Sequence, residues 1–371
     1  MLANIKDCTG CMACVNACPS DAIKIKNDSL FGHLYPFINQ EKCTTCNKCT
    51  KICPALNDQD FNKIQKCYAA YSYNNIADKM SSSGGIAYEL SKYILENNGL
   101  VFGAAFTNNC KIEHIMIDSL NDLEKLSGSK YAQSNASKCY KQIKHTLSNK
   151  KVLFIGTPCQ VAGILNYIPA KLQKNLITID LFCHGVPSNS LLNDIVADYH
   201  DIKNTKNVRF RDNQNHDKYT MSIVTNNNNN KVNLSDNDNF YIKCFLKAFD
   251  LRESCYYCKY SQSKRMGDIS LGDFWGLAED SKIKQTRKNG ISAVLLNTKK
   301  GIDLFTNILE FIKYEERNII ECINGNECLQ RPKKKNREII KFQENWPKNK
   351  NLKVNYKKTF PIKYFLNKVL K

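Results

Sequence analysis

The sequence lacks several features that would assign the protein to a common class. No run approaches the roughly 20 consecutive apolar residues of a membrane-spanning helix, and the opening residues MLANIKDCTG contain no apolar signal region. These two absences predict a cytoplasmic chain. The G-x-G-x-x-G fingerprint of ordinary dinucleotide-binding domains is missing, as are helix-turn-helix and aromatic-basic nucleic-acid motifs. We therefore expect no nucleic-acid partner.

Cysteine, by contrast, is abundant. The chain has 18 cysteines among 371 residues, of which 42% are hydrophobic. That length and composition allow a globular protein with more than one domain. In a reducing compartment, cysteines at this density indicate metal or redox chemistry and not disulfides.

Two segments near the N-terminus repeat one cysteine pattern. The pattern is C-x2-C-x2-C-x3-C-P, and it occurs in CTGCMACVNACPSDAIKI and again in CTTCNKCTKICPAL. In such a repeat, one loop holds three corners of a [4Fe–4S] cubane and the fourth cysteine reaches the other cluster. Zinc is the alternative, but zinc sites usually take four ligands from two pairs. The spacing predicts two [4Fe–4S] clusters, one held by Cys8, Cys11, Cys14 and Cys53, the other by Cys43, Cys46, Cys49 and Cys18.

After a polar connector, apolar strands alternate with helical patterns. The alternation predicts βαβ units and a mainly parallel sheet. Its expected strands are 67–73, 100–106, 151–156 and 176–183, and its expected helices are 84–97, 136–147 and 159–168. A less regular part adds antiparallel strands at 207–212 and 219–225 around the turn NNNNN, a helix at 241–249, a strand at 291–297 and a helix at 301–315.

These patterns divide the chain into three parts. We expect an α+β ferredoxin-like two-cluster module over 1–58, a larger α/β domain with a mainly parallel sheet over 66–330, and a basic extension over 331–371. The extension holds 14 Lys and Arg against 2 Glu, which is +12 of a net charge of +19. Such a tail favours ferredoxin or another acidic redox protein as partner, or contact with a membrane surface. A solvated tail without a partner is the other interpretation.

A second group of cysteines is dispersed along the chain. Cys159 in GTPCQ and Cys183 in LFCHG each lie at the C-terminal end of an expected strand, and Cys255 and Cys258 form a C-x2-C pair. The C-terminal ends of parallel strands share one edge of the sheet, where ligands collect. A single cysteine there is more often a core residue, but four of them predict a third [4Fe–4S] cluster. The cysteines without a motif are expected to be core residues: Cys67, Cys110, Cys139, Cys244, Cys322 and Cys328.

The order of motifs resembles that of the coenzyme F420 hydrogenase/dehydrogenase beta subunit family, which are iron–sulfur flavoproteins. The similarity runs from about residue 66 to the RPKKKNR segment, and many bacterial members carry an N-terminal two-cluster ferredoxin region. The motifs that carry the resemblance are SSSGGIAYEL, GSKYAQS, GTPCQVAGI, FCHGVPS, CYYCKYSQSKRMGDISLGDFWG and NGISAVLLNT.

The resemblance implies an FAD site. Backbone N–H groups at the start of the helix after SSGG can face a pyrophosphate, while a lysine can neutralise a phosphate and a tyrosine can lie against a ring. An ordinary helix N-cap and a surface turn are the alternative interpretations of these segments. The implied FAD-binding residues are Ser83, Gly84, Gly85, Ser129, Lys130, Tyr131, Thr157, Pro158 and Gln160.

Further residues match the family pattern or adjoin it. Arg265, Asp268, Asp273 and Trp275 could anchor the loop of the C-x2-C pair through Arg–Asp pairing. His184, next to Cys183, is a candidate catalytic residue that could transfer a proton to a substrate. A histidine that only packs or forms hydrogen bonds is the alternative.

Together the motifs predict an iron–sulfur flavoprotein oxidoreductase. Electrons from ferredoxin or a partner would pass through the clusters to FAD and on to a small substrate, coenzyme F420 or another hydride acceptor. The alternative is a non-enzymatic electron-transfer subunit that delivers electrons to a partner protein. The substrate and the direction of electron flow are left open by the motifs.

Overall fold

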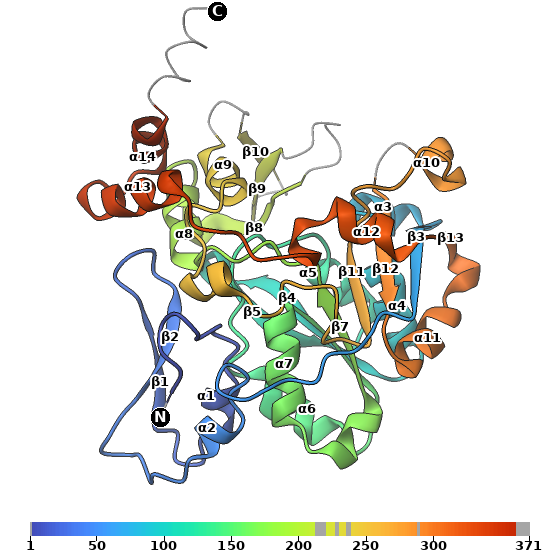
Figure 1. Cartoon of the computed structure of the whole chain (residues 1–371), viewed down its shortest axis with the longest axis horizontal. Helices are drawn as coiled ribbons and strands as arrows, with labels where there is room; N and C mark the ends of the chain where they lie inside the picture. Colours follow the sequence, from blue (N-terminus) through green and yellow to red (C-terminus); the bar gives the residue numbers. More distant parts are fainter. Residues whose placement is uncertain (1, 212–219, 227–229, 235–238, 288–289, 361–371) are drawn as a thin grey trace, which may run out of the picture.

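The computed structural model describes residues 2–211, 220–226, 230–234, 239–287 and 290–360. A small N-terminal region lies at the lower left of Figure 1, beside a larger body built on an eight-stranded sheet. Two helices from the end of the described chain lie above that region. None of the helices in the described part is long and apolar enough to cross a membrane.

The N-terminal region, which is ferredoxin-like as predicted, combines two short helices with a hairpin. Helices α1 (Ala13–Ala17) and α2 (Lys48–Lys51) follow the second cysteine of each repeat. Strands β1 (Ile23–Asn27) and β2 (Leu34–Ile38) pair antiparallel between them.

The two cysteine repeats fold alike. The residues on either side of the second cysteine have left-handed backbone in both, with φ of 66° and 65° at Gly10 and Met12 and 51° and 57° at Thr45 and Asn47. This conformation is costly for residues other than glycine. Since both repeats keep it, the repeat in the sequence is also a repeat in structure.

The body contains a mixed sheet in the order β13-β3-β12-β11-β7-β6-β4-β5. Its strands are β3 (Lys66–Ser72), β4 (Leu100–Thr107), β5 (Lys111–Ile117), β6 (Val152–Gly156), β7 (Leu176–Leu181), β11 (Ile269–Asp273), β12 (Ser292–Leu296) and β13 (Ile312–Glu316). The neighbours β11, β7, β6 and β4 are parallel, and the pairings on both sides of them are antiparallel. The predicted parallel arrangement is therefore the centre of the sheet.

Helices cover both faces of this sheet. Helices α4 (Ile86–Glu96) and α11 (Lys299–Thr306) pack on one face. The other face is covered by α6 (Cys139–Thr146), α7 (Pro158–Tyr167) and α12 (Ile319–Gly325). Shorter helices are α3 (Asn75–Met80), α5 (Leu123–Leu126) and α10 (Lys282–Thr286).

A second core lies above the N-terminal region in Figure 1. Its elements are a small antiparallel sheet of β8 (Thr205–Arg209), β9 (Met221–Thr225) and β10 (Lys231–Leu234) with the helices α8 (Asn189–Ala197) and α9 (Phe240–Leu246). Phe31 of the β1–β2 connection enters the same core. This core therefore joins the small region to the body.

The described part of the basic extension contains two helices. Helices α13 (Arg337–Asn345) and α14 (Leu352–Thr359) pack on the second core. Phe342 is fully buried, and its ring stacks on that of Phe31 with centroids 6.4 Å apart. Residues 361–371, the last part of the predicted basic extension, lie outside the described part of the chain.

Two sequence predictions need correction. The expected helix over 301–315 ends at Thr306, and β13 then pairs with β3. Ile312 and Tyr314 alternate there with charged residues, a period of two that suits an edge strand. The turn NNNNN does not separate the two strands named for it, because it follows β9 and leads to β10.

Candidate functional site

The first cysteine set, Cys8, Cys11, Cys14 and Cys53, surrounds one cavity. All four line it, although Cys53 comes from the second repeat. Cys8, Cys11 and Cys14 are each less than a tenth exposed. The pKa of Cys11 is raised to about 12, mainly by burial and further by the neighbouring thiols Cys159, Cys8 and Cys53. Buried thiols gathered around a cavity fit an iron–sulfur cluster, whose iron ions would supply the missing positive charge.

The second cysteine set, Cys43, Cys46, Cys49 and Cys18, is nearer to solvent. Cys43 and Cys49 pack beside Cys18 in one small apolar cluster, and Cys46 is exposed. Cys18 Sγ accepts a hydrogen bond from the Ala22 N–H at 3.2 Å. A hydrogen bond from the Lys48 backbone lowers the pKa of Cys46. The two N-terminal sets thus differ in their access to water.

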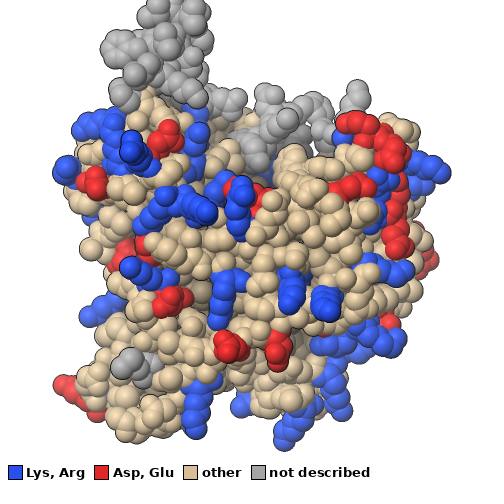
Figure 2. All heavy atoms as spheres, in the orientation of Figure 1, with Lys and Arg blue, Asp and Glu red and all other residues tan. Residues whose placement is uncertain are grey.

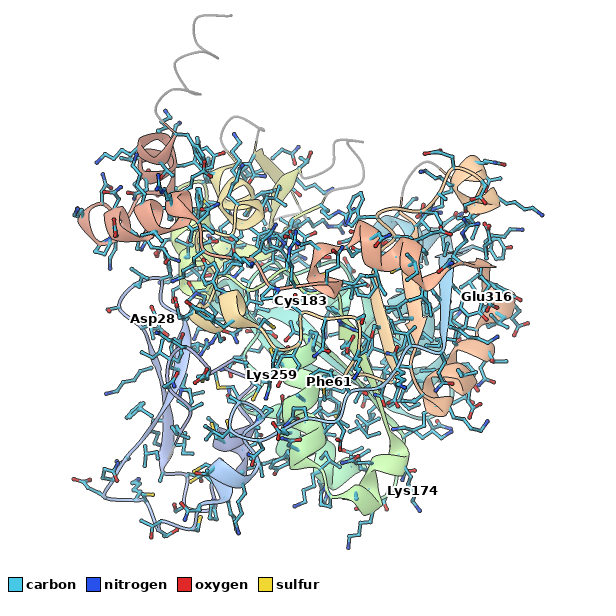
Figure 3. All side chains as sticks on the ribbon, viewed as in Figure 1. Asp28, Phe61, Lys174, Cys183, Lys259 and Glu316 are labelled. Atoms are coloured by element: carbon cyan, nitrogen blue, oxygen red, sulfur yellow. The ribbon has the colours of Figure 1, made fainter. Side chains whose placement is uncertain are left out.

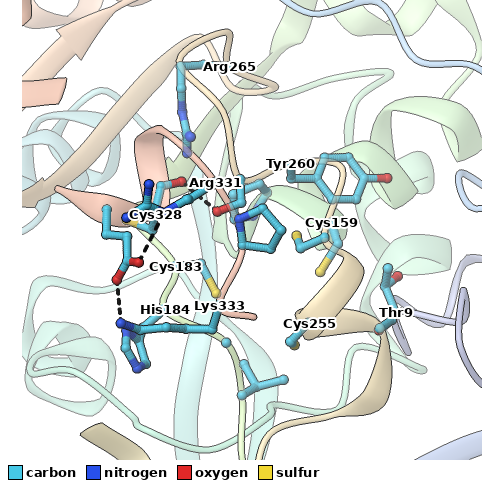
Figure 4. A pocket seen from close by; sticks show the side chains of 18 residues that line it. Thr9, Cys159, Cys183, His184, Cys255, Tyr260, Arg265, Cys328, Arg331 and Lys333 are labelled. Carbon is cyan, nitrogen blue, oxygen red and sulfur yellow. Dashed lines mark hydrogen bonds and ion pairs between the residues drawn. The ribbon is translucent and has the colours of Figure 1, made fainter. Parts of the chain in front are cut away.

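The third cysteine set, Cys159, Cys183, Cys255 and Cys258, comes from three separate segments. Strands β6 and β7 are parallel neighbours, so the residues that follow them meet at one edge of the sheet. The C-x2-C pair comes from the 3-10 helix η5 (Glu253–Tyr257) and its end. All four cysteines line one pocket, the central pocket, with about 680 Å³ of empty space including open solvent (Figure 4).

The pKa shifts of the third set also indicate that its four thiols lie close together. Burial raises the pKa of Cys183 well above its ordinary value, and the nearby Cys255, Cys159 and Cys258 raise it further. Figure 3 shows Cys183 near the middle of the molecule. A cation or cluster at this point would compensate the charge of four thiolates, which burial and their mutual repulsion otherwise disfavour.

The start of α7 explains the position of Cys159. Thr157 is the N-cap residue and Pro158 the first helical residue, where proline's missing N–H costs nothing. Gln160 Oε1 accepts from the Thr157 N–H at 3.1 Å, which closes a capping box. Thr157 Oγ1 lies 3.2 Å from Cys159 Sγ. The helix start therefore fixes the direction of this thiol.

A buried ion pair holds the segment that follows Cys258. Arg265 Nη2 donates to Asp180 Oδ1 at 2.8 Å, and neither side chain is more than 1% exposed. Asp180 Oδ2 also accepts from the N–H groups of Met266 and Gly267, both at 2.9 Å. Arg–Asp anchoring was expected here, but sequence reasoning missed Asp180. Its signal was an acidic residue inside the apolar strand LITIDLFC.

The other residues of the same motif have separate partners. Asp268 Oδ2 accepts from Thr178 Oγ1 at 3.0 Å, which ties β7 to the loop before β11. Asp273 pairs with Arg211 at 2.6 Å. Trp275 is 45% exposed. Arg265 is therefore the member of this motif that lines the central pocket.

The first and third sets adjoin each other. Thr9 lines both the first cavity and the central pocket. Tyr260 is 3% exposed and its hydroxyl has no partner in the described part of the chain. Burial is the main cause that raises the pKa of Tyr260, and four thiols raise it further: Cys159, Cys11, Cys258 and Cys53. Because these thiols come from both sets, the hydroxyl lies between the two sets. Lys259 reaches back to the carbonyls of Pro54 and Asn57.

The residues implied for FAD fall into separate groups. Ser129 N–H donates to Ser82 Oγ at 2.8 Å, which brings the SSGG and GSKY loops together. Gly85 is the left-handed N-cap of α4, with φ 79°. A Cβ at Gly84 would lie 2.4 Å from the Ala70 carbonyl oxygen, so only glycine fits there. Ser83 Oγ lies 3.3 Å from Ser292 Oγ.

The remaining implied residues are engaged elsewhere. Lys130 Nζ donates to the carbonyls of Leu126 and Ser127 at 2.8 Å, and burial lowers its pKa to about 7. The ring of Tyr131 stacks on that of Phe245, with centroids 4.7 Å apart. Of the nine residues implied for FAD, only Pro158 lines the central pocket.

His184 lies at the central pocket, as Figure 4 shows. Burial lowers the pKa of its imidazole to about 4, so the ring is neutral near pH 7. Its Nε2 has no hydrogen-bond partner among the described residues. On the same wall, Glu327 pairs with Arg331 and Lys333.

The six cysteines without a motif are mostly buried, as expected. Cys110, Cys139 and Cys244 lie in the cores, and Cys67 of β3 lies beside Cys322 of α12. Cys328 differs because it lines the central pocket. Across the described ranges, no group of three or more Cys, His, Asp or Glu side chains is arranged to hold a single metal ion.

Comparison with known proteins gives matches over most of the chain. Residues 7–57 match the model of the 4Fe-4S dicluster domain. Residues 67–141 match the N-terminal model of the coenzyme F420 hydrogenase/dehydrogenase beta subunit, and residues 149–321 match the C-terminal model of the same subunit. No curated protein matches the chain.

A solved structure shares the fold. It is a chain of the F420-reducing [NiFe] hydrogenase complex from Methanosarcina barkeri, determined as a xenon derivative. The two chains are 21% identical with a TM-score of 0.51, and the match covers 82% of this chain and 95% of the other.

Proposed function

Because the chain belongs to the coenzyme F420 hydrogenase/dehydrogenase beta subunit family, with an N-terminal 4Fe-4S dicluster domain, we propose that it is an iron–sulfur flavoprotein oxidoreductase. Electrons from ferredoxin or a partner subunit would cross the three cysteine sets to FAD and then reach a small substrate. Coenzyme F420 or another hydride acceptor is the substrate class.

One observation carries this proposal: the third cysteine set surrounds one pocket directly beside the first set. The second set is the exposed end of the series, and the first set lies between it and the central pocket. When bound, clusters would pass single electrons and a flavin would exchange them for a hydride. The protein would fix the order of the three cluster sites and exclude water from the two buried sites.

The central pocket supports an enzyme over a simple electron-transfer subunit. It opens to solvent and is lined by the neutral His184, by the third cysteine set, and by Glu327 with its ion-pair partners Arg331 and Lys333. Such a lining offers hydrogen-bond donors and acceptors to a polar substrate beside the third set. His184 can exchange a hydrogen bond or a proton with a substrate there. The loops of Ser83–Gly85 and Ser129, which the Ser129–Ser82 hydrogen bond joins, would hold part of FAD.

We expect about twelve irons and one FAD per chain after anaerobic reconstitution, since each cubane takes four thiolates. Iron, acid-labile sulfide and flavin analysis would measure this. A content of about eight irons with flavin would contradict the third cluster but not the rest of the proposal. Tightly bound zinc without flavin would contradict the whole proposal.

A second prediction concerns the acidic electron donor. Figure 2 shows Lys and Arg side chains around α13 and α14 at the upper left, and Lys334, Arg337 and Lys341 are exposed there. Electrostatic steering speeds association and weakens with salt. Replacing these three residues by glutamine should therefore lower the association rate of a ferredoxin several-fold at low salt.

Stopped-flow reduction at increasing salt would measure that rate. Substitution suits this test better than deletion, because removing 331–371 would also remove the buried Phe342 and Trp346. The matched control is Lys171→Gln, Lys174→Gln and Lys299→Gln, which removes three charges from the body. An equal loss of rate in both variants, or none in either, would reject docking at α13.

A further inference from the structure

Arg252 is a fully buried cation, with 0% of its surface exposed. In the described part of the chain it forms no ion pair with a carboxylate. Its guanidinium donates to the carbonyls of Cys8 at 2.8 Å and Leu34 at 3.0 Å, and to Gln133 Oε1 at 2.8 Å. A buried charge of this kind is costly unless an opposite charge compensates it.

The groups nearest to Arg252 that could carry negative charge are cluster thiolates. Its Nη2 lies 3.7 Å from Cys8 Sγ in the first set. Towards the third set, burial raises the pKa of Cys159 and Cys255, and the positive charge of Arg252 opposes that rise. Arg252 thus lies at the junction between the two buried sets. A [4Fe–4S] cluster with four thiolates has a net negative charge, which fits the missing compensation.

The two repeats differ at the position that faces this cation. Gly10 and Thr45 stand at equivalent places, both with left-handed backbone. A Cβ at Gly10 would lie 2.8 Å from Arg252 Cζ and Nη1, so a side chain there would displace the guanidinium. The second repeat has threonine there. Glycine at position 10 therefore leaves room for the guanidinium of Arg252 beside the first repeat.

We propose that Arg252 raises the reduction potentials of the two buried clusters relative to the exposed one. This rests on the proposed function, which supplies the clusters. One electron added to a cluster makes it more negative, and a fixed cation in a dry site favours that reduced form. This shift favours the transfer of an electron from the cluster of the second set to that of the first set. No bond or proton is involved in the transfer.

The test is a redox titration of the reconstituted full-length protein followed by electron paramagnetic resonance. In Arg252→Gln, the ratio of reduced to oxidised buried cluster at a fixed potential should fall about tenfold, equivalent to about 59 mV for a one-electron couple. The cluster of the second set should be unchanged. Lys48→Gln is the matched control, because it removes one exposed cation beside Cys46, where solvent screening should limit the change to less than about twofold.

Arg252→Lys covers the case in which the glutamine variant does not retain its iron. Lysine keeps the charge but cannot reproduce all the guanidinium contacts, so an intermediate fall is expected. The proposal would be overturned if Arg252→Gln kept its full iron content and the potentials of the buried clusters were unchanged. If Arg252→Gln lost its iron, unchanged potentials in Arg252→Lys would overturn it. Absence of cluster signals in the unmodified protein would contradict the proposed function instead.

Discussion

Cys159→Ala is expected to lose about four of the irons and to stop electrons from reaching the flavin, while the two N-terminal clusters remain. Cys159 is the member of the third set fixed by the start of α7, and its thiol approaches the first set through Thr9. Without this thiolate, a cubane at the central pocket would have three protein ligands in place of four. Iron analysis and anaerobic flavin reduction by dithionite-reduced ferredoxin would measure both effects.

Cys139→Ala is the matched control for that variant. Cys139 is 1% exposed and belongs to the same core as α7, but it lines neither cavity. Its loss should cost roughly 1 kcal/mol for the small cavity and leave the iron content unchanged. If Cys159→Ala behaves like this control, with full iron and normal flavin reduction, then Cys159 only packs in the core.

Asp180→Asn is expected to lower the free energy of unfolding by about 3–5 kcal/mol, because it leaves the buried Arg265 without its counter-charge. Asparagine would also present an amide N–H towards the N–H groups of Met266 and Gly267, which now donate to the carboxylate. Urea denaturation of the cluster-free chain would measure the loss, and iron analysis would show whether the third set still assembles.

Asp303→Asn is the control for this second variant. Asp303 pairs with Lys299 on α11, where the side chains are 58% and 88% exposed. Exposed pairs are worth at most about 1 kcal/mol. A loss below about 1 kcal/mol in Asp180→Asn as well would mean that the buried pair does not hold the loop. The double variant Asp180→Leu with Arg265→Met should recover part of the stability, since no charge is left unpaired.

The cysteine sets could be predicted because local rules fix them. The spacing C-x2-C-x2-C-x3-C determines which thiols share a loop, and Cys53 joins Cys8 as that rule requires. Cys159 and Cys183 come together because β6 and β7 are adjacent parallel strands. Neither inference needs knowledge of distant contacts.

Other features depend on contacts between distant segments, which one sequence does not reveal. Asp180 and Arg265 are separated by 85 positions, and Arg252 and Cys8 by 244. The antiparallel pairing of β13 with β3 was not predicted because these two strands lie at opposite ends of the body's sequence. The helical extension looked like a charged tail because its few apolar residues, such as Phe342 and Trp346, are spread among lysines.

The contact between Phe31 and the C-terminal helices has a consequence for biosynthesis. Phe31 lies 5.4 Å from Trp346 and 6.4 Å from Phe342, measured between ring centroids. A ribosome releases the N-terminal hairpin long before residue 346 appears, so the hairpin cannot complete its packing during most of translation. The hairpin that is made first therefore completes its packing only after both C-terminal helices have been synthesised, whereas the first cysteine loop can pack on α6 and α7 much earlier.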